Sequence, residues 1–318
     1  MPDTYLVTGG AGFIGSHLVQ RLLRDGKRVV AIDNFNDYYD PAIKRRNAAA
    51  FADVAGVTFV EMDFTDKAAV DQLFTQHSFR GVAHLGAYGG VRYSIGRAEL
   101  YTTVNIAGSV HLLEAARQHD VNTFVFASTS SVYGKTERLP FVEDDPCNQP
   151  LAPYPASKKA IEMMGYTYHN LHQLNFTAVR FFSVYGPAGR PDMMPFMVMD
   201  RIVKQEKITL FDAGQMKRDW TYVGDIVAGV AAALDTPLGF EAINLGRGEP
   251  VLMADFVSIL EELIGKQAVL EIPPAPASEP PITFANIDKA RKLLNYNPTT
   301  DVHTGLAAMW QWYQQTYR

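Results

Sequence analysis

The sequence contains a single cysteine, Cys147, so no disulfide can form within the chain. Such sparing use of cysteine is typical of proteins from reducing compartments. No apolar run reaches the roughly 18 residues that a membrane-spanning helix needs. A strand is expected to begin by Thr4, which leaves no room for a signal peptide. We therefore predict a cytoplasmic protein with no membrane partner.

An excess of basic residues is also missing. The formal net charge is −5, which argues against nucleic acid as the main partner, and there is no run of Lys and Arg that would suggest binding to an anionic membrane. No grouping of His, Cys and carboxylates has metal-ligand spacing, so we predict no metal site. What the chain does have is 318 residues, 47% of them hydrophobic. That is enough for one large α/β domain and a smaller one.

A glycine-rich turn follows the first predicted strand. Gly9, Gly12 and Gly15 allow a tight turn, a close approach of phosphate to the backbone, and close packing of helix against strand. The N–H groups at the start of the following helix can hold a pyrophosphate. The next strand ends at Asp33, whose carboxylate can accept hydrogen bonds from an adenosine ribose and would repel a 2′-phosphate. This order of elements predicts bound NAD rather than NADP.

Strands and helices continue to alternate beyond this point. Buried strands are predicted near 57–62, 81–85, 125–127 and 177–182, and a long helix from about 97 to 119. The order predicts an α/β fold, a Rossmann-type doubly wound parallel sheet with a smaller mixed α/β substrate domain. The boundaries that we predict are 1–181 plus about 221–246 for the NAD-binding domain, and about 182–220 plus 247–318 for the substrate domain.

The stretch from Phe126 to Lys158 carries the candidate chemistry. Hydroxyl side chains follow a buried strand, and Tyr154 and Lys158 are four residues apart on one face of a predicted helix. An ammonium beside a phenol favours the phenolate, so we expect the pKa of Tyr154 to fall from about 10 towards neutrality. Such a phenolate is a general base for a sugar hydroxyl. A surface Tyr–Lys pair is the alternative, because the spacing also arises by chance.

Two further residues allow more than one interpretation. Arg92 lies in the glycine-rich loop after the strand at 81–85, where it is either a ligand for a phosphate or carboxylate or a solvated surface residue. Asn105 lies inside the long predicted helix, where Asn is mildly unfavourable. We expect its side chain to bridge backbone groups near the strand that carries the candidate chemistry rather than to touch a ligand.

These residues resemble the extended short-chain dehydrogenase/reductase family over essentially the whole chain. The glycine turn, Asp33, the Tyr154–Lys158 pair and the Arg218-Asp219 dipeptide fall where that family places them. Within the family the chain is most similar to nucleotide-sugar 4-epimerases, and among these to UDP-glucuronate 4-epimerases. The stretches that carry this narrower match are Asp33–Pro41, Gly90–Ser94 and Gly186–Met193.

The resemblance implies an enzyme that converts UDP-glucuronate to UDP-galacturonate through a transient 4-keto intermediate. It also implies tightly bound, recycled NAD, a UDP-sugar partner, and a homodimer built on two long helices. Tyr154 would be the base, Lys158 its electrostatic partner, and Thr129 the hydroxyl near the sugar O4. The cofactor-binding residues that we predict are Gly9, Gly12, Phe13, Ile14, Gly15, Asp33, Asn34, Asn36, Asp63, Phe64, Leu85, Ala87, Asn105, Ser128, Tyr154 and Lys158.

The same resemblance assigns the substrate-facing residues. Arg190 and Arg92 would meet the sugar carboxylate, and Arg218 the uridine diphosphate. Thr129, Ser130 and Ser183 would face the sugar.

Two differences from relatives bear on the activity. Related dehydratases and decarboxylases carry acids where this chain has Ser130-Ser131, so their absence favours epimerisation. In relatives one loop usually reads Ala-Ala-Gln-Ala-Gly, whereas the corresponding loop here is Gly86–Gly90. This difference is expected to alter the room beside the sugar carboxylate. A Pro-Gly-Asp that relatives carry near the uridine is replaced here by Ala277–Glu279. The alternatives are a UDP-glucose/UDP-galactose 4-epimerase, a decarboxylase or dehydratase, a net dehydrogenase, and a non-catalytic NAD-binding regulator.

Overall fold

A parallel seven-stranded sheet forms the centre of the molecule in the computed structural model, which describes residues 3–275 and 280–317. Its strand order is β10-β6-β5-β4-β1-β2-β3, and each neighbouring pair is parallel. The strands are β1 (Thr4–Thr8), β2 (Arg28–Asp33), β3 (Val57–Glu61), β4 (Gly81–His84), β5 (Thr123–Thr129), β6 (Asn175–Phe181) and β10 (Phe240–Leu245).

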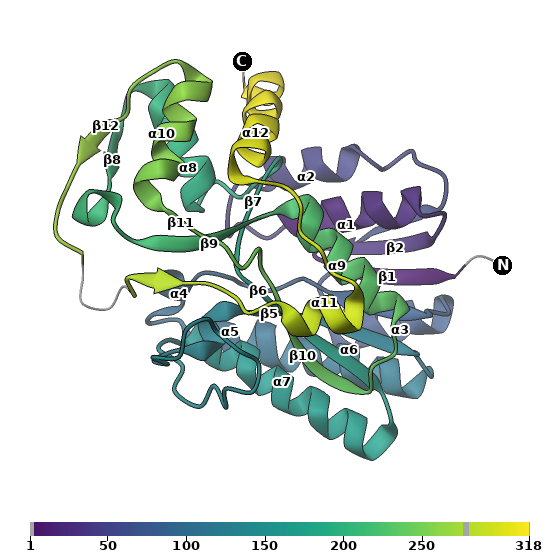
Figure 1. Cartoon of the computed structure of the whole chain (residues 1–318). Coiled ribbons are helices and arrows are strands. Elements are labelled where there is room, and N and C mark those ends of the chain that lie inside the picture. Colours follow the sequence, from purple (N-terminus) through teal and green to yellow (C-terminus); the bar gives the residue numbers. More distant parts are fainter. Residues whose placement is uncertain (1–2, 276–279, 318) are drawn as a thin grey trace.

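Helices cover both faces of this sheet (Figure 1). Strands β4 and β5 are buried along their whole length, as expected for strands of a parallel sheet that are covered on both sides. One face packs against α1 (Phe13–Arg24), α9 (Val223–Asp235) and α11 (Asp288–Leu294). The other face packs against α3 (Lys67–Gln76), α6 (Ser109–Gln118) and α7 (Pro153–His172).

A second group of elements lies beyond the carboxyl ends of the central strands. This group has a separate apolar cluster, in which Trp220 and Phe256 contact each other with ring centroids 4.5 Å apart. Its helices stand together at the top of Figure 1. The elements are α8 (Met194–Lys204), α10 (Met253–Ile264), α12 (Val302–Tyr317), the sheet of β7 (Ser183–Tyr185), β9 (Lys217–Tyr222), β11 (Pro250–Leu252) and β13 (Ile282–Thr283), and the pair β8 (Lys207–Thr209) and β12 (Val269–Glu271).

The predicted doubly wound fold is confirmed, but several local elements differ from the prediction. The long helix is interrupted: α5 (Ala98–Tyr101) and α6 flank a π-helical segment, η1 (Thr102–Gly108). Helix α2 (Pro41–Ala49) was not predicted, although Asp40 caps it by accepting from Ala42 N and Pro41 occupies its first turn, a known start signal. The other short helices are α4 (Val91–Ser94), η2 (Ser130–Tyr133) and η3 (Phe211–Gly214).

Some sequence predictions remain as they were. The proposed division into two domains stays a prediction. The replacement at Ala277–Glu279 lies outside the described residues. None of the helices within residues 3–275 and 280–317 combines the length and the hydropathy that a transmembrane span requires.

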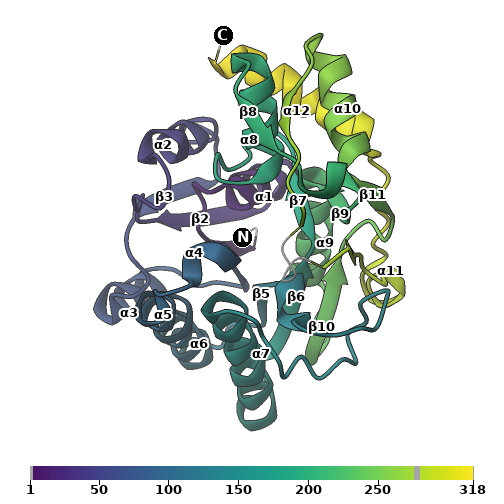
Figure 2. The ribbon, with the colours of Figure 1, turned by 90° about the vertical axis from the view of Figure 1, so that its left-hand side faces the viewer.

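The strand order places a crevice between β1 and β4. These strands are neighbours in the sheet, but the helices that follow them, α1 and α6, lie on opposite faces. The connections therefore diverge at the carboxyl ends of β1 and β4, which is where ligands bind in doubly wound sheets. Figure 2 shows the group of α8, α10 and α12 above the central sheet.

Candidate active site

A cavity of about 390 Å³ opens at this switch point. Residues from both groups of elements line it, so loops far apart in the sequence meet there. The predicted site residues that line the cavity are Gly9, Gly12, Phe13, Ile14, Gly15, Asp33, Asn34, Asn36, Phe64, Leu85, Ala87, Ser128, Thr129, Ser130, Tyr154, Lys158, Ser183 and Arg190.

The turn between β1 and α1 forms one wall of the cavity and has no room for side chains at Gly9 and Gly15. A Cβ at Gly15 would stand 2.0 Å from the carbonyl oxygen of Gly9. Gly9 has a φ of +66°, which favours glycine, and the turn closes with a 2.9 Å bond from Gly12 N to Gly9 O. The result is a bare backbone cradle at a helix N-terminus, which fits a pyrophosphate.

Asp33 ends β2 at the same wall. Its carboxylate is buried and accepts hydrogen bonds from Ala11 N at 3.2 Å and Phe35 N at 2.9 Å. Burial raises the pKa of Asp33, and these bonds oppose the rise. A carboxylate has about four lone-pair sites, so acceptor capacity remains for ribose hydroxyls. The cradle and Asp33 together fit the adenosine diphosphate half of a dinucleotide.

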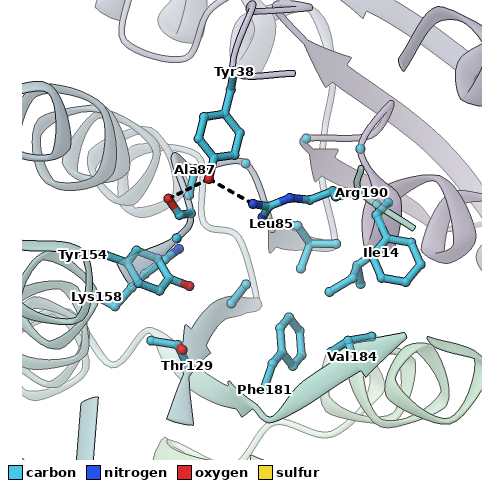
Figure 3. A pocket seen from close by; sticks show the side chains of 18 of the residues that line it. Ile14, Tyr38, Leu85, Ala87, Thr129, Tyr154, Lys158, Phe181, Val184 and Arg190 are labelled. Atoms are coloured by element: carbon cyan, nitrogen blue, oxygen red, sulfur yellow. Dashed lines mark hydrogen bonds between the residues drawn. The ribbon is translucent and has the colours of Figure 1, made fainter. Parts of the chain in front are cut away.

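Tyr154 and Lys158 lie in the first two turns of α7 and both face the cavity (Figure 3). Pro153 begins this helix at a position where its missing N–H costs nothing. Thr129, the last residue of β5, lines the same cavity, and its side chain lowers the pKa of Tyr154 relative to burial alone. Lys158 is buried, and its Nζ lies 4.6 Å from the ring centroid of Phe126.

The predicted fall in the pKa of Tyr154 is wrong for the protein alone. Burial raises this pKa, and the nearby Thr129 side chain and the charge of Arg190 only reduce the rise. The same burial lowers the pKa of Lys158 to about 7. Burial disfavours both the phenolate form of Tyr154 and the ammonium form of Lys158. Both side chains are therefore harder to ionise in the protein alone than they would be in an exposed pair.

Arg190 enters the cavity from the side opposite Thr129 (Figure 3). Its Nε and Nη2 donate to the two carboxylate oxygens of Asp192 at 3.0 and 2.5 Å. Nη2 also donates to the hydroxyl of Tyr38 at 3.0 Å. Burial opposes the guanidinium charge, but Asp192 outweighs it and raises the pKa of Arg190 above its usual range. Arg190 is therefore a permanent cation in a fixed orientation.

Four predicted site residues do not line the cavity. Asp63 accepts a 2.7 Å bond from Asn34 Nδ2, directly behind the wall. Asn105 exchanges two 2.9 Å bonds with the backbone of Tyr88 and donates to Ser157 Oγ, so the expectation that it bridges backbone groups is confirmed. Arg92 is exposed on α4, and Arg218 on β9 donates to the carbonyl of Pro280 at 2.9 Å.

Sequence reasoning missed several residues of the cavity wall. The most notable are Lys44 and Tyr38. Lys44 is buried on the unpredicted helix α2, and its Nζ donates to the carbonyl and side-chain oxygens of Asn36 at 2.8 and 2.7 Å. The sequence signal for this helix is Asp40-Pro41, a cap residue followed by a proline in the first turn. Tyr38 lies in a stretch quoted for the family resemblance, but its direction could not be deduced from its position.

Comparisons with known proteins agree with this geometry. A family model described as NAD dependent epimerase/dehydratase family matches residues 5–246. The chain is 42% identical over 332 aligned positions to UDP-glucuronate 4-epimerase 4 of Arabidopsis thaliana, covering 99% of this chain and 76% of that protein. It is 41% identical to UDP-glucuronate 4-epimerase of Thermodesulfobacterium geofontis, covering 97% and 95%.

A solved structure is also similar to this chain over nearly its whole length. The crystal structure of UDP-glucuronic acid 4-epimerase from Bacillus cereus in complex with UDP-glucuronic acid and NAD superimposes with a TM-score of 0.91. The two chains are 35% identical, and the match covers 99% of this chain and 100% of that one.

Proposed function

Since the chain belongs to the NAD dependent epimerase/dehydratase family, we propose that it is an enzyme that interconverts UDP-glucuronate and UDP-galacturonate by inverting C4. The observation that carries this proposal is the position of Arg190. Its guanidinium lines the same cavity as Tyr154, Lys158 and Thr129, which gives a hexuronate carboxylate a planar cation to meet across from the base. The similarity to UDP-glucuronate 4-epimerases over nearly the whole chain supports it.

The cofactor that we propose is NAD, held by the Gly9–Gly15 turn and Asp33. When bound, it supplies the acceptor and donor of the C4 hydride. Asp33 offers an anionic acceptor at the end of β2, which suits free ribose hydroxyls and opposes a 2′-phosphate. Lys158 is proposed to contact the nicotinamide ribose, as its place in the family motif implies.

Tyr154 is the proposed base for the proton on O4. Thr129 lines the cavity together with Tyr154, so its hydroxyl can hold the sugar oxygen or relay the proton as the phenol gains and loses it. Arg190 acts on the same phenol through its charge, which lowers the pKa of Tyr154 relative to burial alone. Removal of the C4 hydrogen gives a 4-keto sugar, which must present its other face before the hydrogen returns.

A 4-keto uronate is a β-keto acid and loses CO2 when electrons flow from its carboxylate into the ring. Charge-assisted bonds from Arg190 would hold electron density on the carboxylate and oppose that loss. Ser130 and Ser131, which line the cavity, supply no acid that would assist elimination or decarboxylation. Epimerisation is therefore the outcome that these side chains favour.

We also propose a homodimer in which α7 contributes to the interface. Met163, Tyr166 and Leu171 on this helix are all more than half exposed, which is unusual for large apolar side chains clustered on one helix. A cytoplasmic location is proposed from the single, buried Cys147, since a lone thiol fits a reducing compartment.

The test is proton NMR of the purified protein with UDP-glucuronate and no added NAD, with absorbance followed at the NADH band. Formation of UDP-galacturonate without accumulating NADH is the expected result. Release of CO2 and a UDP-pentose would assign a decarboxylase instead. Steady accumulation of NADH would indicate a net dehydrogenase, and no reaction with any UDP-sugar would leave an NAD-binding regulator.

Epimerisation of UDP-glucose and UDP-galactose is the second candidate. The observation in its favour is the ion pair between Arg190 and Asp192, which already neutralises the cation. Conversion of UDP-glucose with UDP-glucuronate untouched would establish it. The Arg190→Ala variant separates the two, because only hexuronate turnover should be lost or diverted to a pentose by-product.

A further inference from the structure

Three loops converge on the guanidinium of Arg190. They follow β2, β4 and β7, and they bring together Tyr38, Gly89 and Arg190. We propose that Tyr38 and Gly89 are positioning residues that hold Arg190 where it selects a sugar 6-carboxylate over a 6-hydroxymethyl group. This inference rests on the proposed function, because it explains how that same site would choose its substrate.

Asp192 fixes one edge of the guanidinium and also removes its net charge. The pair is bidentate, through Nε and Nη2 of Arg190, and most of the Arg190 side chain is shielded from solvent. A neutral ion pair attracts a third charge only weakly at a distance. Recognition of a carboxylate therefore depends on the direction in which the remaining N–H groups point, rather than on a surplus of positive charge.

Tyr38 sets that direction. Its hydroxyl accepts from Arg190 Nη2 at 3.0 Å and lies 3.2 Å from both the Gly89 carbonyl oxygen and Asp192 Oδ2. Figure 3 shows the hydroxyl between the guanidinium and the loop after β4. The phenol has one proton, so it serves one of these two acceptors at a time. In either case the hydroxyl accepts from Arg190, so the cation is tied to Tyr38 in the loop after β2 as well as to Asp192 in its own loop.

Gly89 leaves the space that the guanidinium occupies. A Cβ at this position would stand 2.7 Å from Arg190 Nη1, closer than carbon and nitrogen can approach. The end of an arginine usually moves aside easily, but Asp192 and Tyr38 hold this one. An alanine at position 89 would therefore have to break one of those bonds. The glycines that distinguish Gly86–Gly90 from the loop of the relatives thus affect how Arg190 is held.

The loop that carries Gly89 is itself anchored. Tyr101 at the end of α5 hydrogen bonds through its hydroxyl to the Gly89 carbonyl oxygen, and lies 3.3 Å from that of Gly90. Gly90 has a φ of +83°, and a Cβ there would stand 2.7 Å from the Tyr38 hydroxyl. Both glycines thus bring the backbone up to the Tyr38–Arg190 pair.

The test compares Tyr38→Phe with Tyr93→Phe. The Tyr93 ring packs edge-on against Tyr38 at 4.8 Å, so its variant removes a neighbouring hydroxyl without touching Arg190. Dissociation constants for UDP-glucuronate and UDP-glucose are measured by calorimetry on the NAD-loaded protein. Loss of one charge-assisted hydrogen bond should weaken UDP-glucuronate binding about tenfold in Tyr38→Phe. UDP-glucose binding, and both ligands in Tyr93→Phe, should be unchanged.

A second variant, Gly89→Ala, should weaken UDP-glucuronate binding in the same direction while circular dichroism stays that of the wild type. Both variants should also release more CO2 per turnover. Equal weakening for both sugars, or no change in either variant, overturns the inference. A failure of the proposed function is seen separately, when the wild type does not epimerise UDP-glucuronate. The inference itself is decided by the ratio of the dissociation constants for UDP-glucuronate and UDP-glucose, whether or not the wild type epimerises.

Discussion

The hydroxyl of Ser128 donates a 2.6 Å hydrogen bond to the carboxylate of Glu162. This bond joins β5, which ends at the cavity, to α7, which carries Tyr154 and Lys158. Nε and Nη2 of Arg180 on β6 donate to the same carboxylate at 2.9 and 2.8 Å, and Nζ of Lys159 donates to it at 3.2 Å. The side chains of Glu162 and Arg180 are each only 2% exposed, so a buried ion pair stands directly behind the candidate active site.

Replacing Glu162 by Gln should destabilise the protein by about 3–5 kcal/mol, because Arg180 would remain buried without its counter-ion. Urea unfolding at neutral pH measures the change. Asp25→Asn is the matched control: it breaks the exposed pair with Arg21 and should cost no more than about 1 kcal/mol. Equal costs for the two variants would contradict this reading of the buried pair.

Replacing Tyr154 by Phe should lower kcat by about 10²–10⁴-fold, the usual contribution of a positioned general base. The binding of UDP-sugar should change little, because only one hydroxyl is lost. Tyr166→Phe on the same helix is the control, since Tyr166 is 55% exposed and lies outside the cavity. Kinetics of both variants with UDP-glucuronate make the comparison, and retained turnover in Tyr154→Phe would exclude this residue as the base.

Replacing Lys158 by Met should abolish activity yet stabilise the protein when no nucleotide is added. Burial lowers the pKa of Lys158 to about 7, whereas the unfolded side chain titrates near 10.4. Between these values the unfolded chain binds a proton that the folded chain lacks, so the penalty is absent above about pH 10.4 and complete below about pH 7.

The gain from Lys158→Met should therefore be on the order of 4 kcal/mol at low pH and shrink as the pH rises. Denaturant unfolding of both proteins from acid to alkaline pH measures it. A gain that does not depend on pH would show that packing, rather than the buried charge, is responsible.

Replacing Asp33 by Asn should reduce the preference for NAD over NADP. The variant removes the charge that repels a 2′-phosphate, and buried Lys44 lies close enough to Asp33 for their charges to interact. NAD should bind about tenfold more weakly and NADP more tightly. Titration with each cofactor measures both constants. Asp37→Asn, which makes the same charge change at an exposed position outside the cavity, should leave the preference as in the wild type.

Much of this protein follows from local sequence. The fold was predictable because the glycine turn, the apolar strands and the alternating helices are patterns of neighbouring residues. The same holds for the shared face of Tyr154 and Lys158, since helix geometry fixes which residues four apart lie together. The strand predicted near 57–62, for example, is β3 (Val57–Glu61) in the structure.

The tertiary structure decided what depends on distant residues. Burial raised the pKa of Tyr154 against the expectation from its neighbour Lys158, because desolvation depends on the whole fold. The meeting of Tyr38 with Arg190, 152 positions later, could not be deduced from either segment. The sequence by itself therefore determined the sheet, the nucleotide turn and the reactive pair. Only the packing of loops from different strands decided how the cation is held and how the reactive pair is charged.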